Sequence, residues 1–195
     1  MGSIHLAIPQ KEEPPALHER AMDNLKYIRE TMERATAFTG ISGWGQVAIG
    51  ITALVTSFIA AQQKVFKNWL AIWLAEAVVA LLIAGWSIDR KARAVKTPLL
   101  SGPGRKVAFS LSPPIFAGGL LTIVLYRAGL TGAIPGLWLL LYGTGVVTGG
   151  MFSVSVVPIM GLCFMMLGAA AFLAPAAFAD WFMAAGFGGL HIVSE

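Results

Sequence analysis

Charged residues are scarce in this chain, and long stretches lack them entirely. Asp, Glu, Lys and Arg make up only 12% of the 195 residues, whereas 56% are hydrophobic. A soluble globular domain carries about twice that share of charge, so the composition excludes this class and indicates an integral membrane protein. The single cysteine, Cys163, has no partner for an intrachain disulfide, and its place in an apolar run predicts a buried thiol.

Motifs that carry a known chemistry are also missing. The chain has no HExxH, no paired cysteines, no GxSxG and no nucleotide-binding loop, since GPGRK at 102–106 lacks the required spacing. The histidines His5, His18 and His191 are far apart, and the methionines within 160–166 have a spacing typical of core packing rather than of a metal site. We therefore expect no enzymatic activity, no cofactor and no metal.

The lengths of the uncharged stretches indicate where the membrane spans lie. A bilayer core of about 30 Å needs about 20 apolar residues of helix. The 52 uncharged residues 128–179 suffice for two spans folded back near 151–157. The sequence predicts an all-α, polytopic transmembrane helix bundle with six spans, of which the last is the weakest because it carries Asp180. The expected spans are 39–61, 68–88, 113–127, 134–152, 156–173 and 175–194.

Basic residues predict the orientation. With the N-terminus in the cytoplasm, the cytoplasmic flanks hold ten of them and the opposite flanks hold Lys64, Lys67 and Arg127. The cytoplasmic loop 89–106 is strongly basic, and we expect it to rest on the headgroups of the lipid bilayer rather than on nucleic acid. No signal peptide is expected, because the first 34 residues contain no apolar core.

An amphipathic helix is predicted before the bundle. Residues 1–15 indicate a flexible tail, residues 16–38 a juxtamembrane helix, and residues 39–195 the transmembrane bundle. Spacings of four and three place one apolar seam on the helix. We expect this helix to lie on the membrane or against the cytoplasmic loop, or to bind a protein partner or a second copy through residues 21–35. The seam consists of Ala21, Leu25, Ile28, Met32 and Ala35, and Leu25, Ile28 and Met32 are its candidate partner-binding residues.

Small residues mark close helix contacts. One face of the first span is small or polar, and we expect the second span to pack against it. This face consists of Thr39, Gly43, Gln46, Gly50, Ala53 and Ser57. Gly145 and Gly149 form a GxxxG motif that favours close packing. The glycines of TGISGWG, residues 39–45, allow either a continuous helix or a hinge at the membrane entrance.

Glu76 is the one ionisable residue within the second span. It lies two residues, roughly 3 Å, from the centre of that span. A charge at this depth costs about 2.5 to 3.5 kcal/mol, so the side chain should face other helices. It either carries a proton or cation, or is a neutral group hydrogen-bonded between helices. Thr52 and Tyr142 lie at similar depth and are the expected partners.

The segment Glu19–Leu54, ERAMDNLKYIRETMERATAFTGISGWGQVAIGITAL, together with the closing AAGFGGLHIV, resembles a family of small, uncharacterised bacterial inner-membrane proteins. The resemblance implies a multi-pass protein of the bacterial inner membrane with a juxtamembrane helix. It implies no activity, substrate or catalytic residue.

Two functions remain open from the sequence. The first is a non-catalytic scaffold, sensor or accessory subunit that holds the helix at 21–35 for a partner. The alternative is a small proton- or cation-coupled transporter or channel that uses Glu76.

Overall fold

The computed structural model describes residues 17–36, 43–95, 102–151 and 156–194, and no strand occurs in these ranges. The predicted all-α class is confirmed. The chain divides into two compact units, Met1–Ala35 and Thr36–Glu195. The predicted tail at 1–15 and the possible hinge around Gly40 lie outside the described residues.

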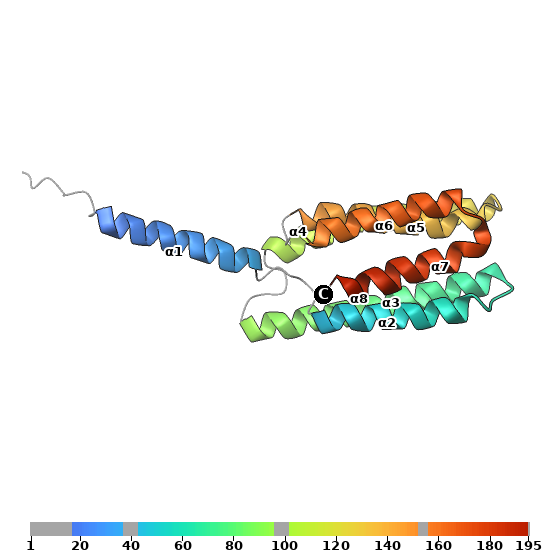
Figure 1. The fold of residues 1–195 in the computed structure, drawn as a ribbon, viewed down its shortest axis with the longest axis horizontal. Helices are drawn as coiled ribbons and strands as arrows, with labels where there is room; N and C mark the ends of the chain where they lie inside the picture. The colour runs from blue at the N-terminus through green and yellow to red at the C-terminus, as the bar shows by residue number, and fades with distance from the viewer. Residues whose placement is uncertain (1–16, 37–42, 96–101, 152–155, 195) are drawn as a thin grey trace, which may run out of the picture. The chain divides into compact units, whose positions relative to one another are not determined.

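Helix α1, Leu17–Thr36, lies within the range 16–38 (Figure 1), and all of it but Thr36 belongs to the first unit. Leu25 and Ile28 are 61% and 51% exposed, and the neighbouring charged residues Lys26 and Arg29 are exposed as well. The side chain of Met32, the third candidate partner-binding residue, is not among those that the structure describes.

Within the described ranges of the second unit, six helices are long and apolar enough to cross a membrane. They run side by side in Figure 1, and the sixth segment, the weakest in the sequence, meets the requirement. The helices are α2 Gly43–Ala60, α3 Phe66–Val95, α4 Gly102–Arg127, α5 Ile134–Gly150 after the short η1 Thr131–Ala133, α6 Val156–Leu173, and a composite last span. The last span, Ala176–Val193, joins η2 Ala176–Phe178, α7 Ala179–Met183, the π-helical η3 Ala184–Leu190 and α8 His191–Val193.

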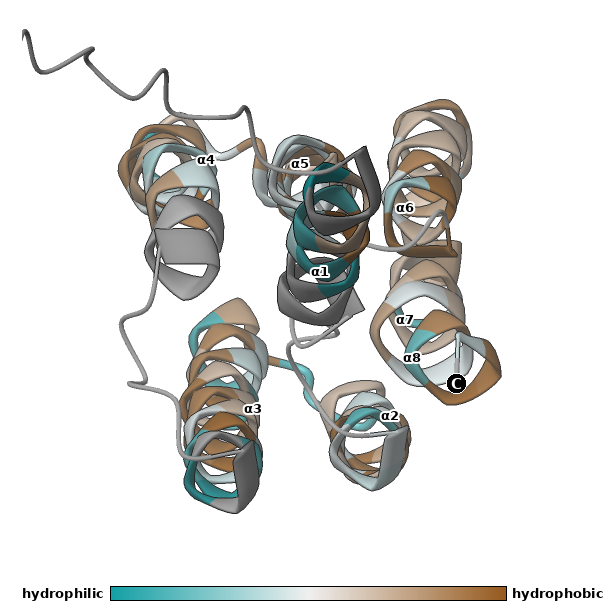
Figure 2. Cartoon of the chain, turned by 90° about the vertical axis from the view of Figure 1, so that its left-hand side faces the viewer, coloured by the Kyte–Doolittle hydropathy of each residue, from teal (hydrophilic) through white to brown (hydrophobic). Residues whose placement is uncertain are grey.

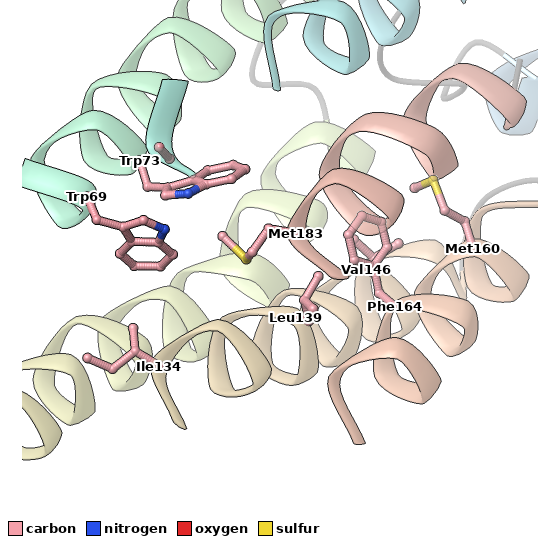
Figure 3. Packing of buried hydrophobic residues seen from close by; sticks show 9 residues of the cluster. Trp69, Trp73, Ile134, Leu139, Val146, Met160, Phe164 and Met183 are labelled. Atoms are coloured by element: carbon pink, nitrogen blue, oxygen red, sulfur yellow. The ribbon is translucent and has the colours of Figure 1, made fainter. Parts of the chain in front are cut away.

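These spans form two rows. Figure 2 shows α4, α5 and α6 in one row and α3, α2 and the last span in the other. The apolar core lies between the rows, where Leu139, Phe164 and Met183 are fully buried (Figure 3). Each row therefore contributes side chains to one shared core.

Glycines seven residues apart bring α5 and α6 into backbone contact. A Cβ on Gly143 would lie 2.7 Å from the carbonyl oxygen of Gly161, and one on Gly168 would lie 2.8 Å from that of Gly136. The predicted GxxxG motif packs against α4 rather than α6, because a Cβ on Gly145 would lie 2.9 Å from the side chain of Leu111. Side chains larger than hydrogen would force α5 and α6 apart.

Two predicted boundaries around the basic loop are wrong. The third spanning helix was expected to begin near Pro113, but α4 begins at Gly102 and contains Pro113 and Pro114. The missing N–H of Pro113 would have bonded the carbonyl of Phe109, and the hydroxyl of Ser112 donates to that carbonyl instead at 3.2 Å. The loop expected at 89–106 is largely helical as well, because α3 extends to Val95.

Candidate functional site

Glu76 lies on the inward face of α3 and is only 8% exposed. Trp69, Trp73, Glu76 and Ser87 are the buried residues among the side chains of this helix that the structure describes. The first three are spaced by four and three residues, which keeps them on one helical face. Leu74, Leu81 and the other exposed apolar residues of α3 point away from this face. The carboxyl group is therefore held inside the bundle rather than against lipid.

Two threonines of α2 bind the carboxyl group of Glu76. The hydroxyl of Thr52 donates to Oε1 at 2.7 Å, and that of Thr56 donates to Oε2 at 3.0 Å. The threonines are one helical turn apart, so both face α3 at the depth of Glu76. Each carboxyl oxygen thus has a partner close to the middle of the span Phe66–Lys91.

This arrangement accepts the carboxyl group with or without its proton. Thr52 Oγ1 is also 2.9 Å from the carbonyl oxygen of Ile49, and a hydroxyl has only one proton to donate. When Glu76 is ionised, Thr52 donates to it. When Glu76 is protonated, the carboxyl can donate to Thr52 while Thr52 donates to Ile49.

Tyr142, the second expected partner of Glu76, bonds another residue. Its hydroxyl lies 3.0 Å from Nε2 of His191. The ring of Phe187 is packed against both Trp73 of α3 and Tyr142 of α5, with ring centroids 6.1 Å and 5.1 Å apart. Because this ring stands between the two helices, similar depth in the membrane does not bring Tyr142 to Glu76.

The small face of α2 packs against the last span instead of α3. A Cβ on Gly50 would lie 2.5 Å from Cγ1 of Ile192 and 2.7 Å from the carbonyl oxygen of Gly188. Ser57 Oγ donates to the backbone oxygen of Asp180 at 2.8 Å. The expectation that the helix of Glu76 covers this face is therefore wrong. Gly43 and Gln46 are only half-buried, and Thr39 lies outside the described residues.

Asp180 joins the last span to α3. The indole Nε1 of Trp69 donates to its Oδ1 at 2.7 Å. The carboxylate lies in the first turn of α7, where the helix dipole favours negative charge. Beside it is a cavity of about 270 Å³ whose lining includes Lys64, Gln63 and Thr131.

A second cavity, of about 450 Å³, lies between the start of α2 and the end of α3, away from the first cavity. Its lining includes Trp44, Trp86 and Arg90. Neither of these two cavities is lined by Glu76. Its surroundings are thus a contact between helices rather than the wall of either described cavity.

Several of these polar contacts were not predicted from the sequence. Thr56 had a usable signal, because it follows Thr52 by one turn and shares its face. The pairs Tyr142–His191 and Trp69–Asp180 join residues 49 and 111 positions apart, and nothing in either segment alone indicates the pairing. Among the described residues, no three His, Cys, Asp or Glu side chains are grouped to hold a metal ion.

Comparisons of the chain with protein families, with curated proteins and with solved structures find no match. The likeness of Glu19–Leu54 to small bacterial inner-membrane proteins therefore stays a prediction. Function is inferred from the geometry of the described helices.

Proposed function

We propose that this protein is a non-catalytic scaffold or accessory subunit of the bacterial inner membrane, with its N-terminus in the cytoplasm. In this role the six-span bundle anchors α1, and α1 binds a cytoplasmic protein partner. The observation that carries the proposal is the exposed apolar seam of α1, a helix that forms a compact unit of its own.

The seam has the spacing of a helix that binds another helix or a groove. The seam residues Ala21, Leu25 and Ile28 are spaced by four and three residues and are all exposed. Anchors at such spacing are typical of amphipathic helices that insert into a protein groove. An exposed seam of this kind gains stability when a partner removes it from water, at about 25 cal/mol per Å² of apolar area.

The charges of α1 favour a protein over a lipid surface. Its sequence, LHERAMDNLKYIRETMERAT, carries four basic and four acidic residues. Helices that lie on anionic membranes are rich in Lys and Arg on their polar face, and acidic residues there would be repelled by the headgroups. Mixed charges beside an apolar seam are typical of helices that pair with other proteins.

Charge placed on the seam should release the partner. We expect Leu25→Asp combined with Ile28→Asp to reduce the amount of partner recovered after crosslinking in native membranes by at least about tenfold, because a buried carboxylate without a counter-charge costs several kcal/mol. Quantitative mass spectrometry of the crosslinked complex measures the recovery. The variant protein should still be inserted in the membrane at the level of the wild type.

Tyr27→Asp is the matched control. Tyr27 is as exposed as Leu25 but lies two residues on, about 200° around the helix from it. Tyr27→Asp therefore adds a negative charge outside the seam, one charge against the two of the double variant. Equal loss of partner in Tyr27→Asp, or a wild-type protein that crosslinks to nothing but lipid, would contradict the proposal.

A second candidate function, proton or cation translocation through Glu76, is favoured by a separate observation. Two polar atoms on the helices that hold Glu76, Trp73 Nε1 and Gln46 Oε1, are buried without a hydrogen-bond partner in the protein. Trp73 is one turn from Glu76 on α3. A water molecule that carries a proton, or that hydrates a cation, would find the unused indole N–H of Trp73 one turn from the carboxyl group.

Neutralising Glu76 tests this candidate. If Glu76 carries the ion, Glu76→Gln should reduce proton or cation flux in proteoliposomes to the level of protein-free vesicles, since the amide keeps the shape but cannot exchange a proton. Asp89→Asn serves as the control, because Asp89 is a carboxylate at the end of the same helix that pairs with Arg93. Flux that is unchanged in Glu76→Gln, or absent in the wild type, removes the candidate.

A further inference from the structure

A groove lies between α2 and α3, at the end of the bundle where the α2 span begins and the α3 span ends. The span of α2 begins at Gly43 and that of α3 ends at Lys91. The groove has a volume of about 450 Å³, and its lining includes Trp44, Ala48, Ile83, Trp86, Arg90 and Lys91. We call it the α2–α3 groove.

The outer part of the groove is basic and aromatic. Trp44 and Trp86 are 82% and 62% exposed, which is typical of tryptophans at the headgroup level of a bilayer. The guanidinium carbon of Arg90 lies 5.5 Å from the ring centroid of Trp86, a cation–π distance that orients the guanidinium. Lys91 adds a second positive charge to the same wall.

The carboxylate next to Arg90 in the sequence is bound by a different residue. Asp89 forms its ion pair with Arg93 at 2.8 Å, and Arg93 does not line the groove. The positive charge of Arg90 therefore attracts anions to the groove wall, and its planar guanidinium suits a phosphate group.

The inner part of the groove is apolar and lies at the depth of the hydrocarbon. Ala48 is five residues inside the start of the α2 span, and Ile83 is eight residues inside the end of the α3 span. These offsets correspond to roughly 7 Å and 12 Å along the helices. A soluble anion cannot fill this part, because it has no apolar portion to place there.

We propose that the α2–α3 groove binds one anionic phospholipid of the adjoining leaflet. Its phosphate headgroup lies at Arg90 and Lys91, and the upper part of an acyl chain lies along Ala48 and Ile83. The site is independent of the partner proposed for α1 and of ion transport at Glu76. It makes the protein selective for anionic over zwitterionic lipid at one defined position.

The test is lipid retention by the full-length protein. Protein is purified from vesicles containing equal amounts of phosphatidylglycerol and phosphatidylethanolamine, and bound lipid is counted by native mass spectrometry. We expect wild-type protein to retain one phosphatidylglycerol in preference to phosphatidylethanolamine. Retention should fall about 25-fold in the double variant Arg90→Gln/Lys91→Gln, since each basic residue near an anionic surface contributes about a factor of five.

Two further variants distinguish binding in this groove from attraction of lipid to any basic end of the bundle. Lys64→Gln/Lys67→Gln removes the same charge at the other end of α3 and should leave retention unchanged. Ile83→Trp keeps every charge but fills the apolar part of the groove, so it should also lower retention. Equal loss in the Lys64/Lys67 variant, full retention in Arg90→Gln/Lys91→Gln or in Ile83→Trp, or equal competition by glycerol phosphate, which has no acyl chain, would overturn the proposal.

Discussion

Replacing Gly143 with valine is expected to separate α5 from α6 and to lower the free energy of unfolding by about 3 kcal/mol. The first added carbon would lie 2.7 Å from Gly161 O and 2.8 Å from Met165 N. These are backbone atoms that cannot rotate away. Lipid is as apolar as the helix surfaces, so the two helices are held mainly by close van der Waals contact, which declines steeply with distance.

Thermal unfolding in detergent, followed by size-exclusion chromatography, measures the effect of Gly143→Val. Gly119→Val is the matched control, because a Cβ on Gly119 of α4 meets no atom within 4 Å. The control should unfold within a few degrees of the wild type. If Gly143→Val is no less stable than Gly119→Val, the backbone contact between α5 and α6 is not what holds these helices together.

Truncating Phe164 to alanine should have an effect of similar size, about 3 kcal/mol, because the side chain is fully buried and its loss leaves a cavity. The ring packs edge-on against Tyr142 with centroids 4.8 Å apart and lies 5.3 Å from Phe187 and 5.5 Å from His191. It thus packs against both residues of the Tyr142–His191 hydrogen bond. We therefore expect the last span to loosen together with the loss of stability.

Hydrogen exchange locates that loosening. In Phe164→Ala, amides of Ala184–Val193 should exchange faster than in the wild type, whereas those of α3 should change little. Phe116→Ala on α4 removes the same atoms from an exposed position and should leave both stability and exchange unaltered. Uniform acceleration across all spans would show that Phe164 acts on global stability alone.

Depth in the membrane could be predicted from the sequence, whereas direction around a helix could not. A helix rises by a fixed amount per residue, so the position of Glu76 near mid-span and the matching depth of Thr52 were correct. Tyr142 lies at a similar depth but faces His191, because the ring of Phe187 intervenes. That ring belongs to a span far beyond α3 in the sequence, so local pattern carried no information about it.

For glycine and proline, too, the local sequence did not predict which neighbours each residue contacts. The six spans and the all-α class follow from length and hydropathy, which the bilayer itself imposes. The GxxxG motif at Gly145 was predicted to mark close helix packing. The closer contact is made by Gly143, which follows Gly136 by seven residues and packs against α6. The third span was expected to begin at Pro113, but the hydroxyl of Ser112 makes this proline tolerable inside α4.

The contacts of Asp180 have a consequence for the order of assembly. Ser57 and Trp69 bind this residue across 123 and 111 positions of sequence, whereas α5 and α6 are joined by a short connection. Contacts between nearby segments can form early, and those between distant segments must wait until both have been synthesised. The α5–α6 pair can therefore close during insertion, while the faces of Gly50 and Ser57 stay uncovered in the lipid until the last span arrives. A mutation in that last span should consequently expose α2 to membrane quality control at a stage when most of the bundle is already formed.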